Sequence, residues 1–274
     1  MRVVVCALAK NEHRYINEWV SHYVKLGFDK LYIYDNDDSF DCQVINYIDK
    51  QYVDKFEIRN IRMLHEDKLQ QKIYTNFYRT ENSKFDWCLF CDIDEFLTGV
   101  DNIKDFLSQP QFKHAYQIRI KWKLFDDNNL IERDMSKSVM ETFTHECKFS
   151  LHRNLKQKGN LEQHGKMIVR GNIDNVIITS PHFASVERRD NVLVSILPSG
   201  KPCRSKVAIE EDYRNETVFL NHYMTKSLSE FIEQKMNRTD AVYGGYHIPL
   251  DYYWRINKMT KEKIDYLRKR KIIY

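Results

Sequence analysis

The sequence contains little glycine and no long apolar segment. Glycine accounts for only 8 of the 274 residues, so we do not expect a long glycine-rich loop that holds phosphate groups. No stretch approaches the roughly 20 apolar residues that a helix needs to cross a bilayer. The opening apolar run, Val3 to Ala9, is too short for a secretory leader and is followed directly by Lys10-Asn11-Glu12. We interpret this run as a first strand and expect a cytoplasmic protein.

The sequence also lacks a strong charge of either sign and a zinc-type cysteine pattern. Its formal net charge is +4 and its charged fraction is 30%, which are values of an ordinary globular protein and exclude a disordered chain. Cys88 and Cys91 form a C-x-x-C, but no second pair follows at zinc spacing. Because both lie in an apolar, strand-like run, their side chains should point to opposite faces. We expect buried, inert thiols, which suit a reducing cytoplasm.

Basic residues gather near the carboxyl end. The apolar residues among them are spaced as on one face of a helix, which predicts a basic helical extension of residues 241–274 after a main domain of residues 1–240. Such a helix either contacts an anionic membrane surface or packs on the main domain with its charges in water. The apolar residues are Ile256, Met259, Ile264 and Leu267, and the basic ones are Lys258, Lys261, Lys263, Arg268, Lys269, Arg270 and Lys271.

Strand-like and helix-like segments alternate through the first half of the chain. Such alternation predicts an α/β protein with a mostly parallel central sheet flanked by helices. The first helix should end at Gly27, because glycine readily adopts the left-handed conformation of a helix C-cap. The expected strands are residues 2–8, 30–34, 53–58 and 87–91, and the expected helices are residues 16–24 and 69–77.

The second half is less regular. A strand is expected at residues 115–122 and a short one at 176–178, whereas residues 156–171 are polar, contain glycine and predict a loop. Late helices are expected from Leu228 and around residues 256–267. No internal repeat and no clear linker divides the chain.

Polar clusters follow three of the predicted strands. They are Lys10-Asn11-Glu12, Asp35-Asn36-Asp37 and Asp92-Ile93-Asp94. In an open parallel sheet, ligands bind at the carboxyl ends of the strands. The sequence therefore predicts a ligand site at this edge of the sheet.

Asp92 and Asp94 are the best candidates for a metal site. Both directly follow a buried strand, and Mg²⁺ or Mn²⁺ is commonly held by one or two carboxylates together with substrate phosphates. Transfer of a sugar from a nucleotide diphosphate benefits from such an ion, because negative charge grows on the leaving phosphate. The pattern predicts a metal-dependent transferase that uses a phosphorylated donor.

Several ordered motifs resemble one known family of enzymes. The sequence is similar to the bacterial family-2-like glycosyltransferases related to glycosyltransferase family 92, and the resemblance spans residues 1 to about 240. The motifs are Ala7-Leu8-Ala9-Lys10-Asn11-Glu12, Tyr32-Ile33-Tyr34-Asp35-Asn36, Gln70 with Lys72 and Tyr74, Phe85-Asp86-Trp87, Asp92-Ile93-Asp94-Glu95-Phe96-Leu97, Glu141-Thr142-Phe143-Thr144 and Asn221-His222-Tyr223 with Lys226-Ser227. The chain departs from the family at Asp126-Asp127-Asn128-Asn129, where the family has Gly-Ser-x-Gly in a loop that borders the acceptor.

The resemblance implies a GT-A fold, a UDP-sugar donor, inversion at the anomeric carbon and a role in cell-surface polysaccharide biosynthesis. It implies a glycan or a lipid-linked saccharide as acceptor. Asn11, Glu12, Asp35 and Gln70 fall where the family holds the nucleotide. Asp92 and Asp94 fall on the ribose and the metal, with Asp94 the better candidate for direct ligation.

The resemblance also suggests the remaining site residues. His222 is the candidate for a third ligand of Mn²⁺ or Mg²⁺, with His182 as its competitor. Lys226 could neutralise the donor diphosphate. Inversion needs a carboxylate that removes the proton of the acceptor hydroxyl, and Glu141 is our candidate, ahead of Asp127 and Asp126.

Three other functions remain open at this point. A metal-dependent nucleotidyltransferase would also place carboxylates at strand ends, but it usually needs a glycine-rich phosphate loop, and residues 7–15 contain no glycine. A nucleic-acid-binding protein would spread basic residues along a face, whereas the charge here is mild and mostly terminal, so we expect no nucleic acid as partner. A degenerate transferase would bind sugar without turnover.

Overall fold

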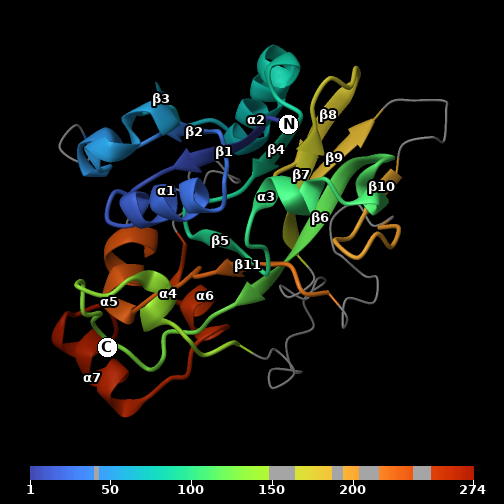
Figure 1. Ribbon diagram of the computed structural model, residues 1–274. Helices are drawn as coiled ribbons and strands as arrows, with labels where there is room; N and C mark the ends of the chain where they lie inside the picture. Colours follow the sequence, from blue (N-terminus) through green and yellow to red (C-terminus); the bar gives the residue numbers. More distant parts are fainter. Residues whose placement is uncertain (40–42, 148–163, 187–193, 204–215, 237–247) are drawn as a thin grey trace.

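The structure of the protein is a computed structural model, which describes residues 1–39, 43–147, 164–186, 194–203, 216–236 and 248–274. Its centre is a large curled sheet with the strand order β3-β2-β1-β4-β7-β6-β11-β5, and β10 pairs with β6 (Figure 1). The strands are β1 (Val3–Ala9), β2 (Lys30–Asp35), β3 (Phe56–Asn60), β4 (Trp87–Phe90), β5 (Glu95–Thr98), β6 (Ala115–Leu124), β7 (Gly165–Arg170), β10 (Val194–Ile196) and β11 (Phe219–His222). A separate hairpin pairs β8 (Val176–Ser180) with β9 (Phe183–Val186).

The sheet is mostly parallel, as predicted. Strands β3, β2, β1 and β4 run parallel to one another, and so do β6, β10 and β11. Strand β7 is antiparallel to both β4 and β6, and β5 is antiparallel to β11. The carboxyl ends of β1, β2 and β4 therefore meet at one edge of the sheet.

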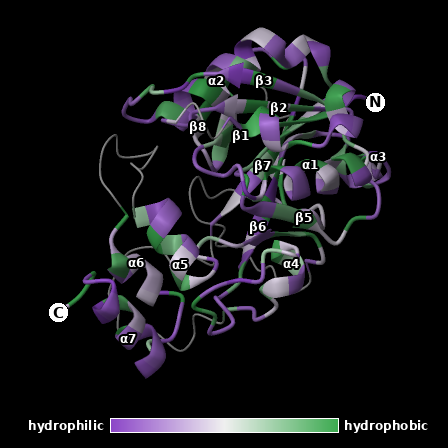
Figure 2. Cartoon of the chain, turned by 90° about the vertical axis from the view of Figure 1, so that its left-hand side faces the viewer, coloured by the Kyte–Doolittle hydropathy of each residue, from purple (hydrophilic) through white to green (hydrophobic). Residues whose placement is uncertain are grey.

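Helices cover both faces of the parallel half of the sheet. Helix α1 (Ile16–Lys25) lies on one face and α2 (Leu69–Glu81) on the other (Figure 1). Because both faces are covered, β1 is buried along its whole length and its side chains alternate between two apolar clusters. Figure 2 shows β1 mostly in hydrophobic colours. Gly27 follows α1 with a φ of +88°, in agreement with its predicted place as a C-cap.

Shorter helices complete the fold. They are α3 (Ile103–Leu107), α4 (Val139–Thr142), α5 (Leu228–Glu230), α6 (Leu250–Trp254) and α7 (Lys261–Lys269), and α5 continues into the π-helical turn η8 (Phe231–Met236). The last three helices and η8 surround a third apolar cluster that contains Phe231, Tyr253 and Leu267. None of the helices described is long and apolar enough to cross a membrane.

Two local predictions differ from the structure. Residues 156–171 were expected to form a loop, but the part of that segment after residue 163 contains the central strand β7, while residues 156–163 lie outside the described residues. The prediction was wrong because Lys166 is polar in the sequence but is buried in β7, where it contacts the Asp92 carboxylate. The third strand begins only at Phe56, since residues 50–55 form a 3₁₀ helix.

Other sequence predictions are confirmed, are corrected in part, or lie outside the described residues. Cys88 and Cys91 are both fully buried and belong to different apolar clusters, as their spacing on a strand predicted. The proposed boundary between residues 240 and 241 falls in a segment that the structure does not describe. The single helix expected around residues 256–267 is instead α7 (Lys261–Lys269), and Ile256 and Met259 precede it outside any helix. Ile256 and Leu267 are buried and Ile264 is half-buried, whereas Met259 is 61% exposed, so the four residues do not share one helix face.

Candidate active site

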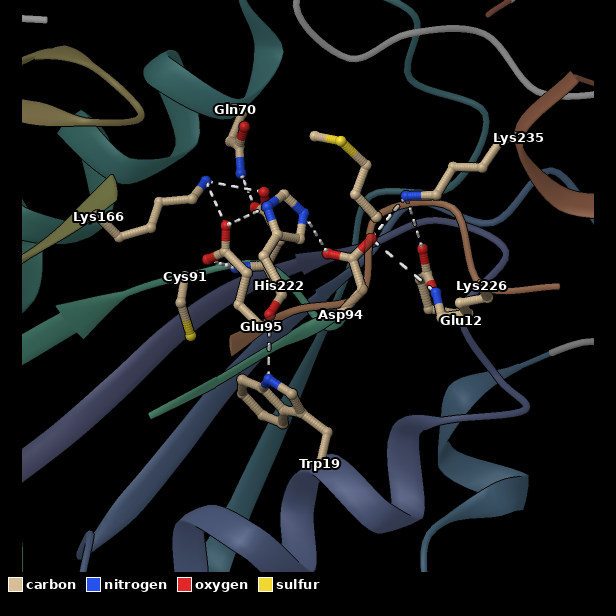
Figure 3. Close-up of polar contacts among 12 residues, drawn as sticks. Glu12, Trp19, Gln70, Cys91, Asp94, Glu95, Lys166, His222, Lys226 and Lys235 are labelled. Carbon is tan, nitrogen blue, oxygen red and sulfur yellow. Dashed lines mark hydrogen bonds and ion pairs between the residues drawn. The ribbon is translucent and has the colours of Figure 1, made fainter. Parts of the chain in front are cut away.

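Asp92 and Asp94 lie in a tight turn between β4 and β5. The backbone carbonyl of Asp92 accepts a hydrogen bond from Trp19 Nε1 at 3.1 Å, and its backbone N–H donates to Glu95 Oε2 at 2.9 Å. Tyr74 donates to the carbonyl of Cys91 at 3.0 Å. Trp19 of α1 and Tyr74 of α2, which lie on opposite faces of the sheet, thus hold the turn from both sides, and Figure 3 shows the contact of Trp19.

The Asp92 carboxylate is held by two donors. Gln70, in the first turn of α2, donates to Oδ1, and Lys166 Nζ lies 2.8 Å from Oδ2. Burial raises the pKa of Asp92, but the charge of Lys166 outweighs it, so the pKa falls below its usual range. Gln70 and Asp92, both predicted to contact the nucleotide, are therefore in direct contact.

The Asp94 carboxylate is buried and faces different groups with its two oxygens. Oδ1 lies 3.4 Å from His222 Nε2, whereas Oδ2 lies 2.6 Å from Lys235 Nζ and 3.9 Å from Lys226 Nζ. Burial raises the pKa of Asp94, but Lys235, His222 and Lys226 outweigh this effect and hold the pKa well below the usual range. Asp94 is thus ionised and lies at the centre of the cluster.

His222 reaches Asp94 because of the register between β11 and β5. The antiparallel pairing sets His222 opposite Glu95, and His222 Nδ1 lies 3.8 Å from Glu95 Oε1. Both of these buried atoms lack a hydrogen-bond partner among the described residues. Histidines that ligate a metal usually direct their second nitrogen to a carboxylate or a carbonyl. Glu95 therefore stands where such an orienting partner would be.

Glu12 connects the cluster to the end of β1. Its Oε2 lies 3.3 Å from Lys226 Nζ and its Oε1 lies 3.7 Å from Lys235 Nζ. Lys226 has a φ of +55°, and its ammonium lies 4.1 Å from the centre of the Tyr15 ring. In total, the carboxylates of Glu12, Asp92, Asp94 and Glu95 face the ammonium groups of Lys166, Lys226 and Lys235. In such a site, the lysines can bind the phosphates of a ligand and the carboxylates can bind a cation.

Asn11 and Asp35 lie at the neighbouring strand ends. Asn11 follows β1 with a φ of +56°, and its backbone N–H donates to the Asp37 carboxylate. Asp35 ends β2, with Oδ2 2.9 Å from an Arg62 nitrogen and Oδ1 accepting from the Asp37 backbone N–H at 3.1 Å. Burial raises the pKa of Asp37 to about 6. The structure therefore brings the first two polar clusters together, as predicted.

The two candidate histidines have different surroundings. His182 lies between β8 and β9, where its Nδ1 is 2.8 Å from the Gly165 carbonyl and its ring packs edge-on against Trp122. Burial lowers the pKa of His182 to about 3. His222 is the histidine that faces Asp94.

Glu141 and Asp127 also have different surroundings. Glu141 is exposed and belongs to a capping box at the start of α4, in which the Ser138 N–H and hydroxyl donate to its Oε2 at 3.0 and 2.8 Å. Asp127 is 1% exposed and its Oδ2 contacts Lys263 and Tyr253 of the carboxyl-terminal segment. Asp126 accepts from the Asn128 N–H at 2.8 Å. The contacts of Asp127 are those of a residue that holds the carboxyl-terminal segment, and Glu141 is the more accessible carboxylate.

The donors around Asp94 fit a divalent ion that a ligand helps to hold. The described residues contain no group of three or more histidine, cysteine, aspartate or glutamate side chains arranged around a metal. However, Mg²⁺ is usually held by one or two protein ligands plus water and substrate phosphates. Two ligands at right angles, each about 2.1 Å from an ion, are about 3 Å apart, close to the 3.4 Å between Asp94 Oδ1 and His222 Nε2.

Three residues of the cluster were not predicted from the sequence. Glu95 directly follows the Asp92-Ile93-Asp94 motif, and its position alone could have indicated it. Lys166 was missed because its segment was predicted to be a loop. Lys235 was missed because the pattern of a helix does not indicate that one of its residues contacts Asp94, which is far away in the sequence.

Comparisons with known proteins found two partial similarities. No protein-family model matches the chain. Over 106 residues, which are 37% of this chain and 18% of the relative, the sequence is 28% identical to a glycosyltransferase family 92 protein of Ricinus communis. The chain therefore covers less than a fifth of that relative. The crystal structure of S. aureus TarS aligns with a TM-score of 0.34 and 15% identity over 53% of this chain and 28% of that one.

Proposed function

We propose that this protein is a glycosyltransferase that moves a sugar from a UDP-sugar to a glycan or a lipid-linked saccharide. The observation that carries the proposal is the buried pair of Asp94 and His222, surrounded by lysines at the carboxyl edge of a parallel sheet. The partial similarity to a glycosyltransferase family 92 protein supports the same class.

The donor would lie across the ends of β1, β2 and β4. Asn11, Glu12 and Asp35 would contact the nucleoside, together with Gln70 and Asp92, which already hydrogen-bond each other. Lys226 would meet the diphosphate, since its buried ammonium is paired only loosely with Glu12 at 3.3 Å. An ammonium in a low-dielectric site stabilises the negative charge of the leaving UDP more strongly than it would in water.

A divalent ion, Mn²⁺ or Mg²⁺, would be held by Asp94 and His222. When bound, the ion would supply further positive charge to the leaving diphosphate. Glu95 would fix the orientation of His222 by accepting from its Nδ1. Asp92 would contact the ribose and support the ion less directly, since both of its oxygens already have protein partners.

Inversion at the anomeric carbon would require a base on the acceptor side. We assign this role to Glu141, because its carboxylate is exposed and belongs to the Glu141-Thr142-Phe143-Thr144 motif on which the family resemblance rests. The acceptor would belong to cell-surface polysaccharide biosynthesis at the inner face of the cell membrane.

A donor screen tests the proposal. The purified protein is incubated with Mn²⁺ and a panel of UDP-, GDP-, CMP- and dTDP-sugars, and the slow release of nucleotide is measured with and without a chelator. We expect one UDP-sugar to be hydrolysed well above the others, and only in the presence of the metal. Release of pyrophosphate from a sugar phosphate and UTP, without sugar transfer, would instead indicate a nucleotidyltransferase.

A further inference from the structure

Lys235 occupies one side of the proposed metal ligand. Its ammonium lies 2.6 Å from Asp94 Oδ2 and 3.7 Å from Glu12 Oε1, and only 8% of the residue is exposed. The other oxygen of Asp94 faces His222 Nε2. Figure 3 shows both contacts of Asp94. Asp94 is therefore shared between a lysine and the position where we propose that a divalent ion binds.

The local backbone is unusual at this point. Lys235 lies in the π-helical turn η8 (Phe231–Met236), which continues α5. Single π-helical turns are rare and are frequently found at functional sites. Helix α5 itself is held by the capping box of Ser227 and Glu230, and Glu230 accepts a hydrogen bond from Tyr15 at 2.5 Å. The helix that carries Lys235 is thus held by buried hydrogen bonds of Glu230 to Ser227 and to Tyr15, which directly precedes α1.

The lysine and a divalent ion would compete for the same carboxylate. Two positive groups on one buried aspartate repel each other strongly, because a protein interior screens charge far less than water does. A bound diphosphate would reduce this repulsion, since its negative oxygens can accept hydrogen bonds from the Lys235 ammonium and can also ligate the ion. The lysine would then have a partner other than Asp94.

We infer that Lys235 makes divalent-ion binding at Asp94 conditional on the nucleoside diphosphate. This inference rests on the proposed function for the identity of the ligand. In the ligand-free protein Lys235 neutralises Asp94 and keeps the ion out. When UDP or a UDP-sugar binds, the ammonium turns from Asp94 Oδ2 to the phosphates, and the ion binds between Asp94 Oδ1 and His222. Lys226 contributes less, because its ammonium is 3.9 Å from Asp94.

Mn²⁺ binding, measured from the electron paramagnetic resonance signal of the free ion, tests the inference without any turnover. For wild type we expect UDP to tighten Mn²⁺ binding about 5- to 150-fold, the usual range of coupling between two sites. In Lys235→Met, Mn²⁺ should bind the UDP-free protein tighter by a factor in the same range, so that the effect of UDP shrinks. Lys235→Arg should keep the wild-type pattern, because the positive charge remains.

Controls separate the possible failures. Lys261→Met removes an exposed lysine and should leave Mn²⁺ binding unchanged, and Lys235→Gln replaces the Met variant if thermal melting shows that Met disturbs the fold. If Mn²⁺ binds UDP-free Lys235→Met or Lys235→Gln no tighter than wild type, the inference is wrong. If wild type fails to bind Mn²⁺ even with UDP and hydrolyses no UDP-sugar, the proposed function fails as well. Retained UDP-sugar hydrolysis with unchanged Mn²⁺ binding in the variants would overturn the lysine inference alone.

Discussion

Asp94 Oδ1 and His222 Nε2 lie 3.4 Å apart, because β11 pairs with β5 in a register that sets His222 opposite Glu95. Two residues that are far apart in the sequence thus meet in one place. If this pair holds the metal, Asp94→Asn should lower Mn²⁺-supported UDP-sugar hydrolysis by at least about 100-fold. Asn is preferred to Ala, since Ala would remove the side-chain oxygen that lies 2.6 Å from the Lys235 ammonium. Full activity of the Asn variant, or of wild type with a chelator, would contradict the role.

Glu141→Gln tests the general base with little disturbance of the fold. Glutamine can keep the capping box with Ser138, which involves Oε2 of Glu141, but it cannot accept a proton. Transfer to an acceptor should fall by about 10²–10⁴, while donor hydrolysis and melting temperature should hardly change. A variant with near-normal transfer would exclude Glu141 as the base.

Asp37 predicts a pH-dependent change in stability. Burial, together with the charges of Asp35 and Glu12, raises its pKa to about 6, although the N–H of Asn11 lowers it. An unfolded aspartate has a pKa of about 3.9, so the folded protein binds more protons between roughly pH 4 and 6, and stability falls as the pH rises through this window. Asp37→Asn should therefore raise the melting temperature at pH 8 but not at pH 4. Equal gains at both pH values would show that ionisation is not the cause.

The carboxyl-terminal segment should depend on one buried ion pair. Lys263 is fully buried and contacts the Asp127 carboxylate and the Lys258 carbonyl, the latter at 3.0 Å. Lys263→Met leaves Asp127 charged and buried, which should reduce the free energy of unfolding by about 3–5 kcal/mol in urea denaturation. Lys261→Met, at an exposed position in the same helix, is the control. A loss below about 1 kcal/mol for Lys263→Met would mean that Asp127 finds another partner.

Membrane contact through this segment remains a prediction. Ile256 and Leu267 are buried in the protein, so the exposed basic residues of α7 and its end would have to supply most of the attraction. About 1 kcal/mol per basic residue near anionic lipid is expected, and binding should be sensitive to salt. Replacing Arg268, Lys269, Arg270 and Lys271 by Gln should abolish co-sedimentation with anionic vesicles, whereas Lys50→Gln with Lys55→Gln should not. Equal binding of wild type to anionic and neutral vesicles would exclude this contact.

The sequence was most informative where strands are buried on both faces. The runs that became β1, β2 and β4 are almost continuously apolar, and polar clusters follow each of them, so both the parallel sheet and its ligand edge could be predicted. Strand β7 was missed for the opposite reason. Lys166 looks like a surface residue in the sequence, but its charge is compensated by Asp92 from another strand, and a pattern along one strand cannot contain that information.

The cluster around Asp94 shows the same limit. Asp94 and His222 could be proposed from short motifs, but the contact of Lys235 depends on how α5 and η8 fold back toward β1 and β4. A lysine in an amphipathic helix normally faces water. Only the tertiary arrangement shows that this one is buried against two carboxylates.

The position of β11 has a consequence for the synthesis of the chain. This strand lies between β6 and β5, although both of its neighbours precede it by about a hundred residues in the sequence. While the ribosome has not yet released Phe219–His222, β5 and β6 each expose an unpaired edge, and such edges readily pair with other chains. A nascent or truncated chain that stops before β11 should therefore aggregate or recruit chaperones, even though its first four parallel strands are already complete.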